Sequence, residues 1–464
     1  MRSTAALALA LSAAIGAVAC SSAPVAAPAS APRGVDTTPA AKVAAPPASA
    51  SAAPESKPKQ DENRARVMAM TRRVSQARGL PVLREVGVKT LDRAQILAKI
   101  REHVEKEIPP ATLEHEGEAL AALELIPDDY DYLKGSYALI QGRIAGFYEP
   151  LDQTMYLVDD LDEDEADETL AHELVHALQD QSFSIGPTLS YKPGQGDRAA
   201  AAHALIEGDA TSAMFDVVAG SAFNVDERLF SGLVAASTAL SAEGAATPHL
   251  LQASLASPYT DGFRFVQALR GRGDWAAVDG AFRRLPASTE QLLHPSKYDG
   301  GEAPIEVSPP APGPLGEGFR AVLDDVMGEQ GMRLGFAEWA HRDRAAAAAE
   351  GWGGDHYIVA RRDPPGASTA GGEGSPHQIA VGWRMVFDTA RDATEAAALL
   401  GARFGQRCRE RPRLGPLAWK VRGAWIALAA GPYERTGLKA RSAGSCALAE
   451  RWVDAMLAQP APTR

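Results

Sequence analysis

Two histidines and a glutamate stand within five positions of each other, in the stretch His172 to His176. On an α-helix, residues four apart lie one turn above each other, so the imidazoles of His172 and His176 share one side and can bind one metal ion. Glu173 is rotated away from them and is free to hold a water molecule. This arrangement, HExxH, suits hydrolysis in which a zinc ion and a carboxylate together activate water.

A zinc ion used in this way takes three protein ligands and leaves its fourth position to water. The best candidate for the third ligand is Glu207, which lies 31 residues after His176 (207 − 176) in an alanine-rich helical stretch, Ala204 to Asp216. Asp209 is a rival. Because residues two apart on a helix point in different directions, we expect Asp209 to orient a histidine instead of binding the metal.

The motif needs a helix, and Glu207 needs a second helix packed against the first. Apolar residues recur at helical spacing around the motif, and neither glycine nor proline interrupts Asp167 to Gln181, which predicts a helix there. Ser182 to Gly196 contains two prolines and three glycines, so we expect a loop in which the chain turns back.

Two short strands are predicted directly before the motif helix, at Arg143 to Phe147 and Thr154 to Val158. An edge strand in this place can bind an extended peptide through backbone hydrogen bonds; alternatively, the strands only complete a sheet. The acidic run Asp159 to Glu168 comes next, and we interpret it as a solvated helix cap that interacts favourably with the helix dipole. A calcium site, or attraction of a basic substrate, is the alternative.

Four motifs resemble those of a prokaryotic family in the gluzincin branch of zinc metallopeptidases: HELVHALQDQ at 172–181, GFYEP at 146–150, EGDAT at 207–211 and STEQLLHP at 288–295. The resemblance covers residues 80 to 300, and the C-terminal third less specifically through GWGGDHY at 351–357. It implies a mainly helical, zincin-like catalytic domain with a small sheet, Zn²⁺ as the cofactor and a peptide or protein as the substrate. Position by position, it implies His172, His176 and Glu207 as metal ligands and Glu173 as the general base.

Hydrolysis of this kind also needs a donor for the negative charge that develops on the substrate carbonyl oxygen. His294 and Tyr298 are the catalytic candidates, because both follow the helix-like segment Trp275 to Leu285 in a polar stretch within the part that resembles the family. Alternatively, His294 caps a helix end and Tyr298 packs with its hydroxyl hydrogen-bonded. His203 lies four residues before Glu207, on the same helix face, where it can touch the site.

The first residues are typical of an export signal. Arg2 supplies a positive charge, an apolar stretch runs from Thr4 to Val18, and small residues precede Cys20. This predicts a signal peptide over residues 1–19. The segment also resembles the lipobox of bacterial lipoproteins, which implies a lipid on Cys20 and attachment to a membrane outside the cytoplasm. Ser21 resembles an outer-membrane sorting signal.

Cysteine content and composition agree with that location. Besides Cys20 the chain has only Cys408 and Cys446, which can form a disulfide in an oxidising compartment. Residues 20–61 are rich in alanine, serine and proline, which predicts a disordered tether after the lipid. The net charge of −12 argues against nucleic-acid binding. No second apolar run is long enough to cross a bilayer.

The rest of the chain is predicted to be α+β, with a catalytic domain at 62–307 and a C-terminal α+β domain at 308–464. Five prolines between Pro304 and Pro314 mark the boundary. In the first domain a helix is clearest at 91–104. In the second, the patterns predict helices at 319–330, 336–348, 392–404 and 446–457, and strands at 357–360, 379–387, 417–421 and 425–428. We interpret Gly351 to Asp355 as a structural turn and the arginine-rich segment Arg403 to Arg413 as a solvated face.

The sequence therefore predicts a lipid-anchored, zinc-dependent peptidase of the bacterial cell envelope. An alternative is an inactive envelope lipoprotein that binds a peptide or protein partner through a peptidase-like cleft. A third possibility is hydrolysis of an amide other than a peptide.

Overall fold

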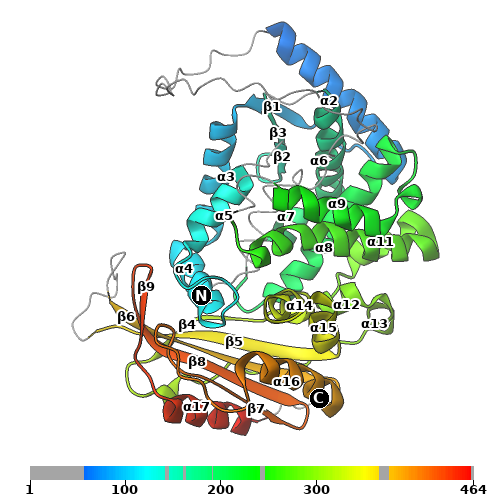
Figure 1. The fold of residues 1–464 in the computed structure, drawn as a ribbon. Helices are drawn as coiled ribbons and strands as arrows, with labels where there is room; N and C mark the ends of the chain where they lie inside the picture. The colour runs from blue at the N-terminus through cyan, green and yellow to red at the C-terminus, as the bar shows by residue number, and fades with distance from the viewer. Residues whose placement is uncertain are drawn as a thin grey trace, which may run out of the picture.

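The structure is a computed structural model that describes residues 57–141, 146–159, 163–190, 192–240, 246–364 and 376–460. The fold is α+β, as predicted: helices surround a small sheet and stand over a larger one (Figure 1). The predicted signal peptide, Cys20 and the tether up to residue 56 lie outside the described residues, and residues 57–61 already belong to helix α2 (Lys57–Arg78). In the described part of the chain, no helix combines the length and apolarity needed to span a bilayer.

The small sheet has the strand order β1-β3-β2, with β1 (Gly87–Leu91) parallel to β3 (Thr154–Val158) and β2 (Gly146–Glu149) antiparallel to it. The prediction for β3 is confirmed. The first predicted strand is found as β2, beginning at Gly146 among the described residues, since 142–145 lie outside them. Strand β1 was not predicted. Strand β2 lies at an edge of the sheet, and it contacts helix α6 (Glu163–Phe183), which carries the HExxH residues.

The helices of this part are longer and more numerous than predicted. Helix α6 begins inside the acidic run. The side chains of residues 160–166, on which most of the calcium alternative rests, lie outside the described residues. The predicted loop 182–196 contains the short helix α7 (Ile185–Leu189). The others are α3 (Arg93–Glu107), α4 (Pro110–Ala122), α5 (Tyr132–Gln141), α8 (Gly196–Val218), α9 (Glu227–Leu240), α11 (His249–Arg283), α12 (Thr289–Leu293) and α13 (Pro295–Gly300).

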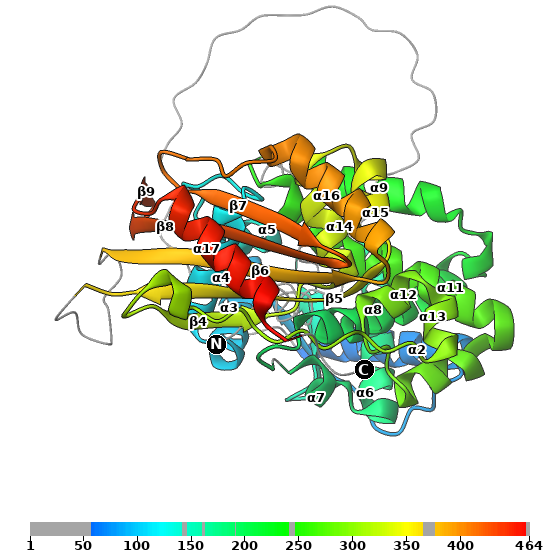
Figure 2. The same ribbon diagram turned by 90° about the horizontal axis from the view of Figure 1, so that it is seen from below.

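The larger sheet is antiparallel, with the order β4-β5-β6-β8-β7 and β9 added to β8. Helix α17 (Cys446–Ala458) lies across one face, as Figure 2 shows from below. Successive residues of a strand point to opposite faces of the sheet. Ile358 therefore packs with α17, whereas Val359 faces α14 (Gly328–Trp339) and α16 (Ala390–Phe404). The strands are β4 (Arg320–Asp325), β5 (Trp352–Arg362), β6 (His377–Phe387), β7 (Leu417–Arg422), β8 (Trp425–Thr436) and β9 (Lys439–Ser442), and α15 (Arg342–Ala349) completes the unit.

Three predictions for this unit are wrong. The helix predicted at 319–330 is strand β4 followed by the start of α14, because pairing with β5 overrides the local helical spacing. The helix at 336–348 is divided between α14 and α15. The segment predicted as a turn at Gly351 to Asp355 mostly forms the start of β5, although its role is structural as expected. Gly354 is required there, since an added Cβ would lie 2.1 Å from the carbonyl oxygen of Ile305.

One hydrophobic core joins the N-terminal helices to the larger sheet. Buried side chains of α3, α4 and α5 belong to the same cluster as those of α14, α16 and strands β5, β6 and β8. Asp355 of β5 is buried in this core. Its carboxylate accepts hydrogen bonds from the indoles of Trp352 and Trp383 and from two backbone N–H groups, at 2.8–3.0 Å. The predicted disulfide between Cys408 and Cys446 is present.

Candidate metal centre

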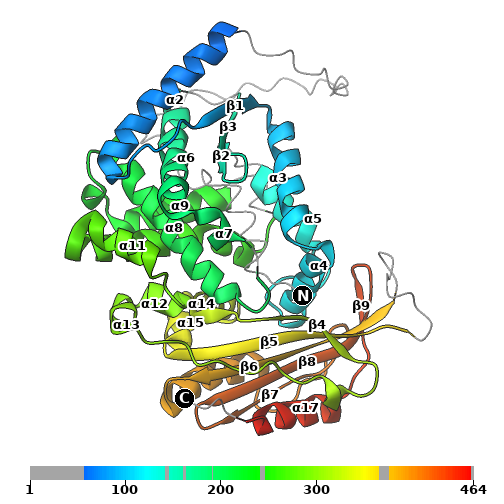
Figure 3. The same ribbon diagram turned by 180° about the vertical axis from the view of Figure 1, so that it is seen from behind.

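Helix α6 is buried on most of its surface, which fixes the direction of its polar side chains. Its apolar residues pack against those of α2, the small sheet and α8. Figure 3 shows these elements beside α6 from behind. His172, Glu173 and His176 are nevertheless buried with it, at 0%, 1% and 7% exposure. Buried polar groups need partners, so these three side chains must find theirs within the protein.

Helix α8 brings Glu207 to the motif. It packs closely on α11 through a pair of glycines, because an added Cβ on Gly208 would lie 2.1 Å from the backbone of Gly262. Glu207, which precedes Gly208, is 1% exposed and points toward α6. Its Oε1 lies 3.0 Å from Nε2 of His203, one turn earlier, and its Oε2 remains for the motif histidines.

Three ligand atoms converge between the two helices. The Nε2 atoms of His172 and His176 lie 3.2 Å apart, and Oε2 of Glu207 lies 3.1 Å from the first and 3.6 Å from the second. Zinc with bonds of about 2.0–2.1 Å in tetrahedral geometry separates its ligand atoms by about 3.3–3.4 Å. The edges of this triangle therefore fit the spacing of a zinc ligand set. We call these three residues the metal-site triad.

The buried carboxylate of Glu207 and the imidazoles around it shift one another's pKa values. Burial lowers the pKa of His172. Burial acts in the same direction on His176, but the Glu207 carboxylate outweighs it and raises the pKa of His176 to about 9. Burial would raise the pKa of Glu207, yet the three imidazoles around it hold that pKa well below its ordinary range. The Glu207 carboxylate thus favours a positive charge beside it in this buried place.

Glu173 lies beside the triad without belonging to it. One of its carboxylate oxygens lies within 4.8 Å of a ring nitrogen of each motif histidine. Its Oε2 accepts a hydrogen bond from the backbone N–H of Tyr148 on β2 at 2.8 Å, and its Oε1 is buried without a partner among the described residues. Burial raises the pKa of Glu173 to about 8. A buried, unpaired carboxylate oxygen beside two imidazoles is suited to accepting a proton.

A series of buried, hydrogen-bonded side chains orients His176 through its Nδ1 atom. Its Nδ1 lies 2.8 Å from Oε1 of Gln179, whose amide donates to Oδ2 of Asp209 at 2.8 Å. Asp209 is paired in turn with Arg78 of α2, which also contacts Asp279 of α11, at 2.6 and 2.8 Å. The expectation that Asp209 orients a histidine agrees with this geometry, with Gln179 between them. His172 has no such support, since its Nδ1 is buried without a partner among the described residues.

We expect Gln179→Met to weaken zinc binding about 10- to 100-fold, the range typical of groups that orient a metal-bound histidine. Methionine keeps the volume but removes the acceptor for His176 Nδ1. The measurement is competition for Zn²⁺ against a chelator of known affinity. Gln181→Met is the matched control, because Gln181 lies on the same helix and binds the backbone of residues 83 and 84. Equal zinc affinities of the two variants would contradict the assignment.

The two candidates for the oxyanion donor make their contacts elsewhere. Nε2 of His294 lies 2.9 Å from Oε1 of Glu329 on α14, and the hydroxyl of Tyr298 donates to the carbonyl of Arg284 at 2.8 Å. No hydrogen bond or ion pair joins either to the triad in the described residues. Tyr298 therefore has the structural environment described by the alternative prediction. His294 is the C-cap residue of α12, where its backbone N–H donates to the carbonyl of Glu290 at 2.8 Å, so it lies at a helix end as the alternative prediction states.

Sequence reasoning missed several neighbours of the triad. Gln179 follows His176 by three residues, so helical spacing alone places the two on one face. Arg78 and Tyr259 carry no such signal, because they reach the site from distant segments. The ring of Tyr259, fully buried on α11, lies 5.9 Å from the ring of His172 between centroids.

Comparison with known proteins bears on the C-terminal unit only. Residues 317–434 match the family model described as "Domain of unknown function (DUF8575)". No curated protein and no solved structure matches the chain. The matched range runs from just before β4 into β8 and contains no residue of the triad, so the chemistry of the triad has to be argued from its own geometry.

Proposed function

We propose that this protein is a zinc-dependent peptidase of the bacterial cell envelope, anchored by a lipid on Cys20. His172, His176 and Glu207 bind the zinc ion, and Glu173 is the general base. The observation that carries the proposal is the buried triangle of two imidazole nitrogens and one carboxylate oxygen, whose 3.1–3.6 Å edges fit the ligand spacing of Zn²⁺.

Zinc held by such a donor set supplies a Lewis acid for the substrate carbonyl and a water with a pKa near neutral. The protein supplies the rest. Glu173 takes the proton of the attacking water on its unpaired Oε1 and returns it to the leaving amine, while the Tyr148 N–H fixes its other oxygen. A positive charge beside the histidines acts against burial and favours the ionised form of the Glu173 carboxylate.

Strand β2 supports a peptide as the substrate. It is an edge strand, and its Tyr148 N–H already contacts the base, so an extended chain added beside β2 passes the reacting groups. Such pairing depends on backbone hydrogen bonds, which peptides offer and most other amides do not. This favours a peptidase over hydrolysis of an amide other than a peptide.

The test is cleavage of a diverse peptide library by the zinc-loaded full-length protein, with products identified by mass spectrometry. We expect new peptide ends only in the zinc-loaded sample, and none after the metal is removed with a chelator and the chelator dialysed away. Readdition of Zn²⁺ should restore cleavage. If a folded protein with one bound zinc cuts nothing, the peptidase proposal fails and the binding lipoprotein takes its place.

A further inference from the structure

Helix α8, which carries Glu207, begins where the C-terminal unit meets α12 and α14 (Figure 1). The backbone N–H of its first residue, Gly196, donates to Oδ1 of Asp325 at the end of β4, at 2.8 Å. Oδ1 of the next residue, Asp197, accepts hydrogen bonds from the backbone N–H and the hydroxyl of Thr289 on α12, at 3.0 and 2.5 Å. We call the contact made by these four residues the α8 junction.

The connection between β4 and α14 closes the α8 junction on one side. Gly328 packs so closely on Asp197 that an added Cβ would lie 1.8 Å from its Oδ1. The backbone N–H groups of Met327 and Gly328 donate to Asp355, each at 3.0 Å, and that of Gln330 donates to the hydroxyl of Thr289 at 3.0 Å. The carboxyl group of Asp197 is therefore enclosed by protein atoms.

The carboxyl groups of the junction are buried without a cation. Asp197 and Asp325 are 4% and 1% exposed. Glu116 of α4 lies close enough to Asp325 to be affected by its charge; it is fully buried, and its Oε1 has no partner among the described residues. No arginine, lysine or histidine forms an ion pair with any of the three in the part of the chain that the structure describes. Burial of an unpaired carboxylate is strongly disfavoured, so these groups retain protons.

The charged groups around the junction do not change this balance. The nearby basic side chains either bind other carboxylates or are exposed: His294 contacts Glu329 at 2.9 Å, His356 contacts Asp324 at 3.5 Å, Arg333 contacts Asp261 at 2.5 Å, and Arg198 is exposed. The other titratable neighbours are acidic or neutral. Asp355 repels Asp325, Tyr132 donates its hydroxyl to Oε2 of Glu116 at 3.2 Å, and the buried Tyr357 lies beyond it.

The pKa values give the direction of the pH dependence. Burial raises the pKa of Asp197 to about 7, against the hydrogen bonds from Thr289. Burial also raises the pKa values of Glu116 and Asp325 well above their ordinary range, and neighbouring carboxylates act in the same direction. A group with a raised folded-state pKa stabilises the closed form fully below its unfolded pKa, about 4 for a carboxyl group. That contribution is lost as the pH rises through the folded-state pKa.

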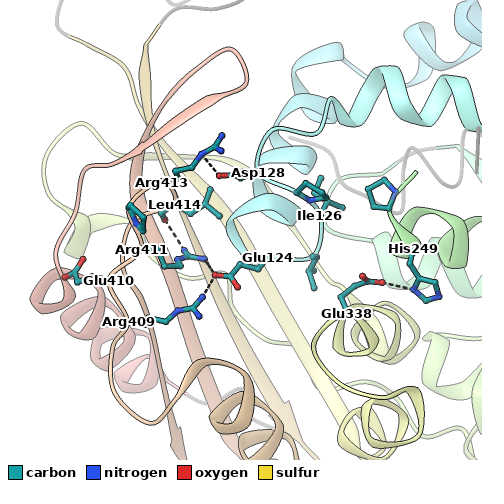
Figure 4. Close-up of a pocket in the computed structure, with 14 residues that line it drawn as sticks. Glu124, Ile126, Asp128, His249, Glu338, Arg409, Glu410, Arg411, Arg413 and Leu414 are labelled. Atoms are coloured by element: carbon teal, nitrogen blue, oxygen red, sulfur yellow. Dashed lines mark hydrogen bonds and ion pairs between the residues drawn. The ribbon is translucent and has the colours of Figure 1, made fainter. Parts of the chain in front are cut away.

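A second contact between the N-terminal helices and the C-terminal unit is built differently. Glu124 pairs with Arg411 at 3.1 Å and also with Arg409, and Asp128 pairs with Arg413 at 2.7 Å (Figure 4). The prediction of a solvated arginine face is therefore wrong for Arg411, which is 7% exposed. Ion pairs of this kind persist as carboxyl groups ionise, so of the two contacts it is the α8 junction that weakens as the pH rises.

We propose that the α8 junction is a pH-sensitive contact: protonated Asp197, Asp325 and Glu116 hold α8 and α12 against the C-terminal unit, and release of their protons opens it. In the closed form these side chains are buried, and in the open form they reach water and ionise. The inference does not rest on the proposed peptidase activity. Because α8 also carries Glu207, opening affects the helix that supplies one residue of the metal-site triad.

The test is hydrogen exchange of the metal-free, full-length protein, followed by mass spectrometry. The informative peptides contain the amides that donate the hydrogen bonds of the junction, those of Gly196, Thr289, Met327, Gly328 and Gln330. Their exchange, corrected for the intrinsic rate, measures opening. We expect the opening constant to rise about tenfold per pH unit, between about pH 5 and about pH 7, for each proton that opening releases.

The variants remove one titrating proton at a time. Asp197→Asn and Asp325→Asn keep the oxygen that accepts the hydrogen bonds, so each should reduce the rise by about tenfold per pH unit and leave the junction more closed than in the wild type at about pH 7. Glu116→Gln should do the same, and it tests the proposal if an aspartate variant does not fold. The matched control is Asp128→Asn, whose carboxylate pairs with Arg413 at the second contact and which should keep the wild-type pH dependence.

Three outcomes would overturn the proposal. An opening constant of the wild type that does not change with pH shows that no proton is released. Asparagine variants that open more than the wild type at about pH 7 show that ionised carboxylates stabilise the junction. A control variant that flattens the pH dependence as much as the junction variants shows that the effect does not belong to these side chains.

Discussion

Replacing Glu173 with glutamine should reduce peptide turnover about 10²- to 10⁴-fold, the contribution typical of a general base. Glutamine fills the same space and can still accept the hydrogen bond from the Tyr148 N–H, but it cannot take a proton from water. Zinc content should stay the same, because Glu173 is outside the triad. Since burial disfavours the ionised carboxylate, the neutral side chain should leave thermal stability equal or slightly higher. The measurement is kcat on the best library peptide, with zinc quantified in the same samples.

Glu102→Gln is the matched control, since Glu102 is exposed and pairs with Lys106 one turn away. It should keep the wild-type rate. If Glu173→Gln turned over peptides as fast as this control, another group would have to be the base, and the unpaired Oε1 of Glu173 would need a different explanation. If both variants and the wild type bind zinc and peptide without cleavage, the binding role is supported.

The parts of the site that follow from local spacing could be predicted, and those that depend on distant segments could not. Residues four apart on one helix must share a face, so His172 and His176, and likewise His203 and Glu207, are paired by the sequence alone. Arg78 reaches Asp209 across 131 positions and Tyr259 reaches His172 from α11, contacts that only tertiary packing creates. The orienting groups of a site are therefore harder to find than its ligands.

The same distinction explains the errors in the fold. The residues of β4 have the spacing of an amphipathic helix, with Val322, Leu323 and Val326 at compatible positions. In the structure Leu323 and Asp325 instead alternate inward, because β5 offers an unpaired edge and the core lies on one side of it. When a strand pairs with a segment that is distant in the sequence, that pairing determines its secondary structure more than its own residue pattern does.

The identity of the third ligand gives the other large effect. Glu207→Gln should raise the Kd for zinc more than about 100-fold, beyond the range of an orienting group, because it removes the only negative charge of the triad. At a free zinc concentration 1,000 times the wild-type Kd, bound metal stabilises the fold by about 4 kcal/mol, and a 100-fold weaker site reduces that to about 1.4 kcal/mol. The measurement is the change in unfolding free energy on adding Zn²⁺.

Asp209→Asn, the variant of the rival ligand, should behave in the opposite way. It leaves buried Arg78 with Asp279 as its remaining carboxylate partner in the described residues, which should destabilise the metal-free protein by about 3–5 kcal/mol. The increment on adding zinc should nevertheless stay close to the wild-type value, with a loss of affinity no larger than that of Gln179→Met, since both act through His176. The two variants are thus distinguished by how much added zinc raises the unfolding free energy, and not by the stability of the metal-free protein. A larger loss of that increment in Asp209→Asn than in Glu207→Gln would make Asp209 the ligand and refute the triad.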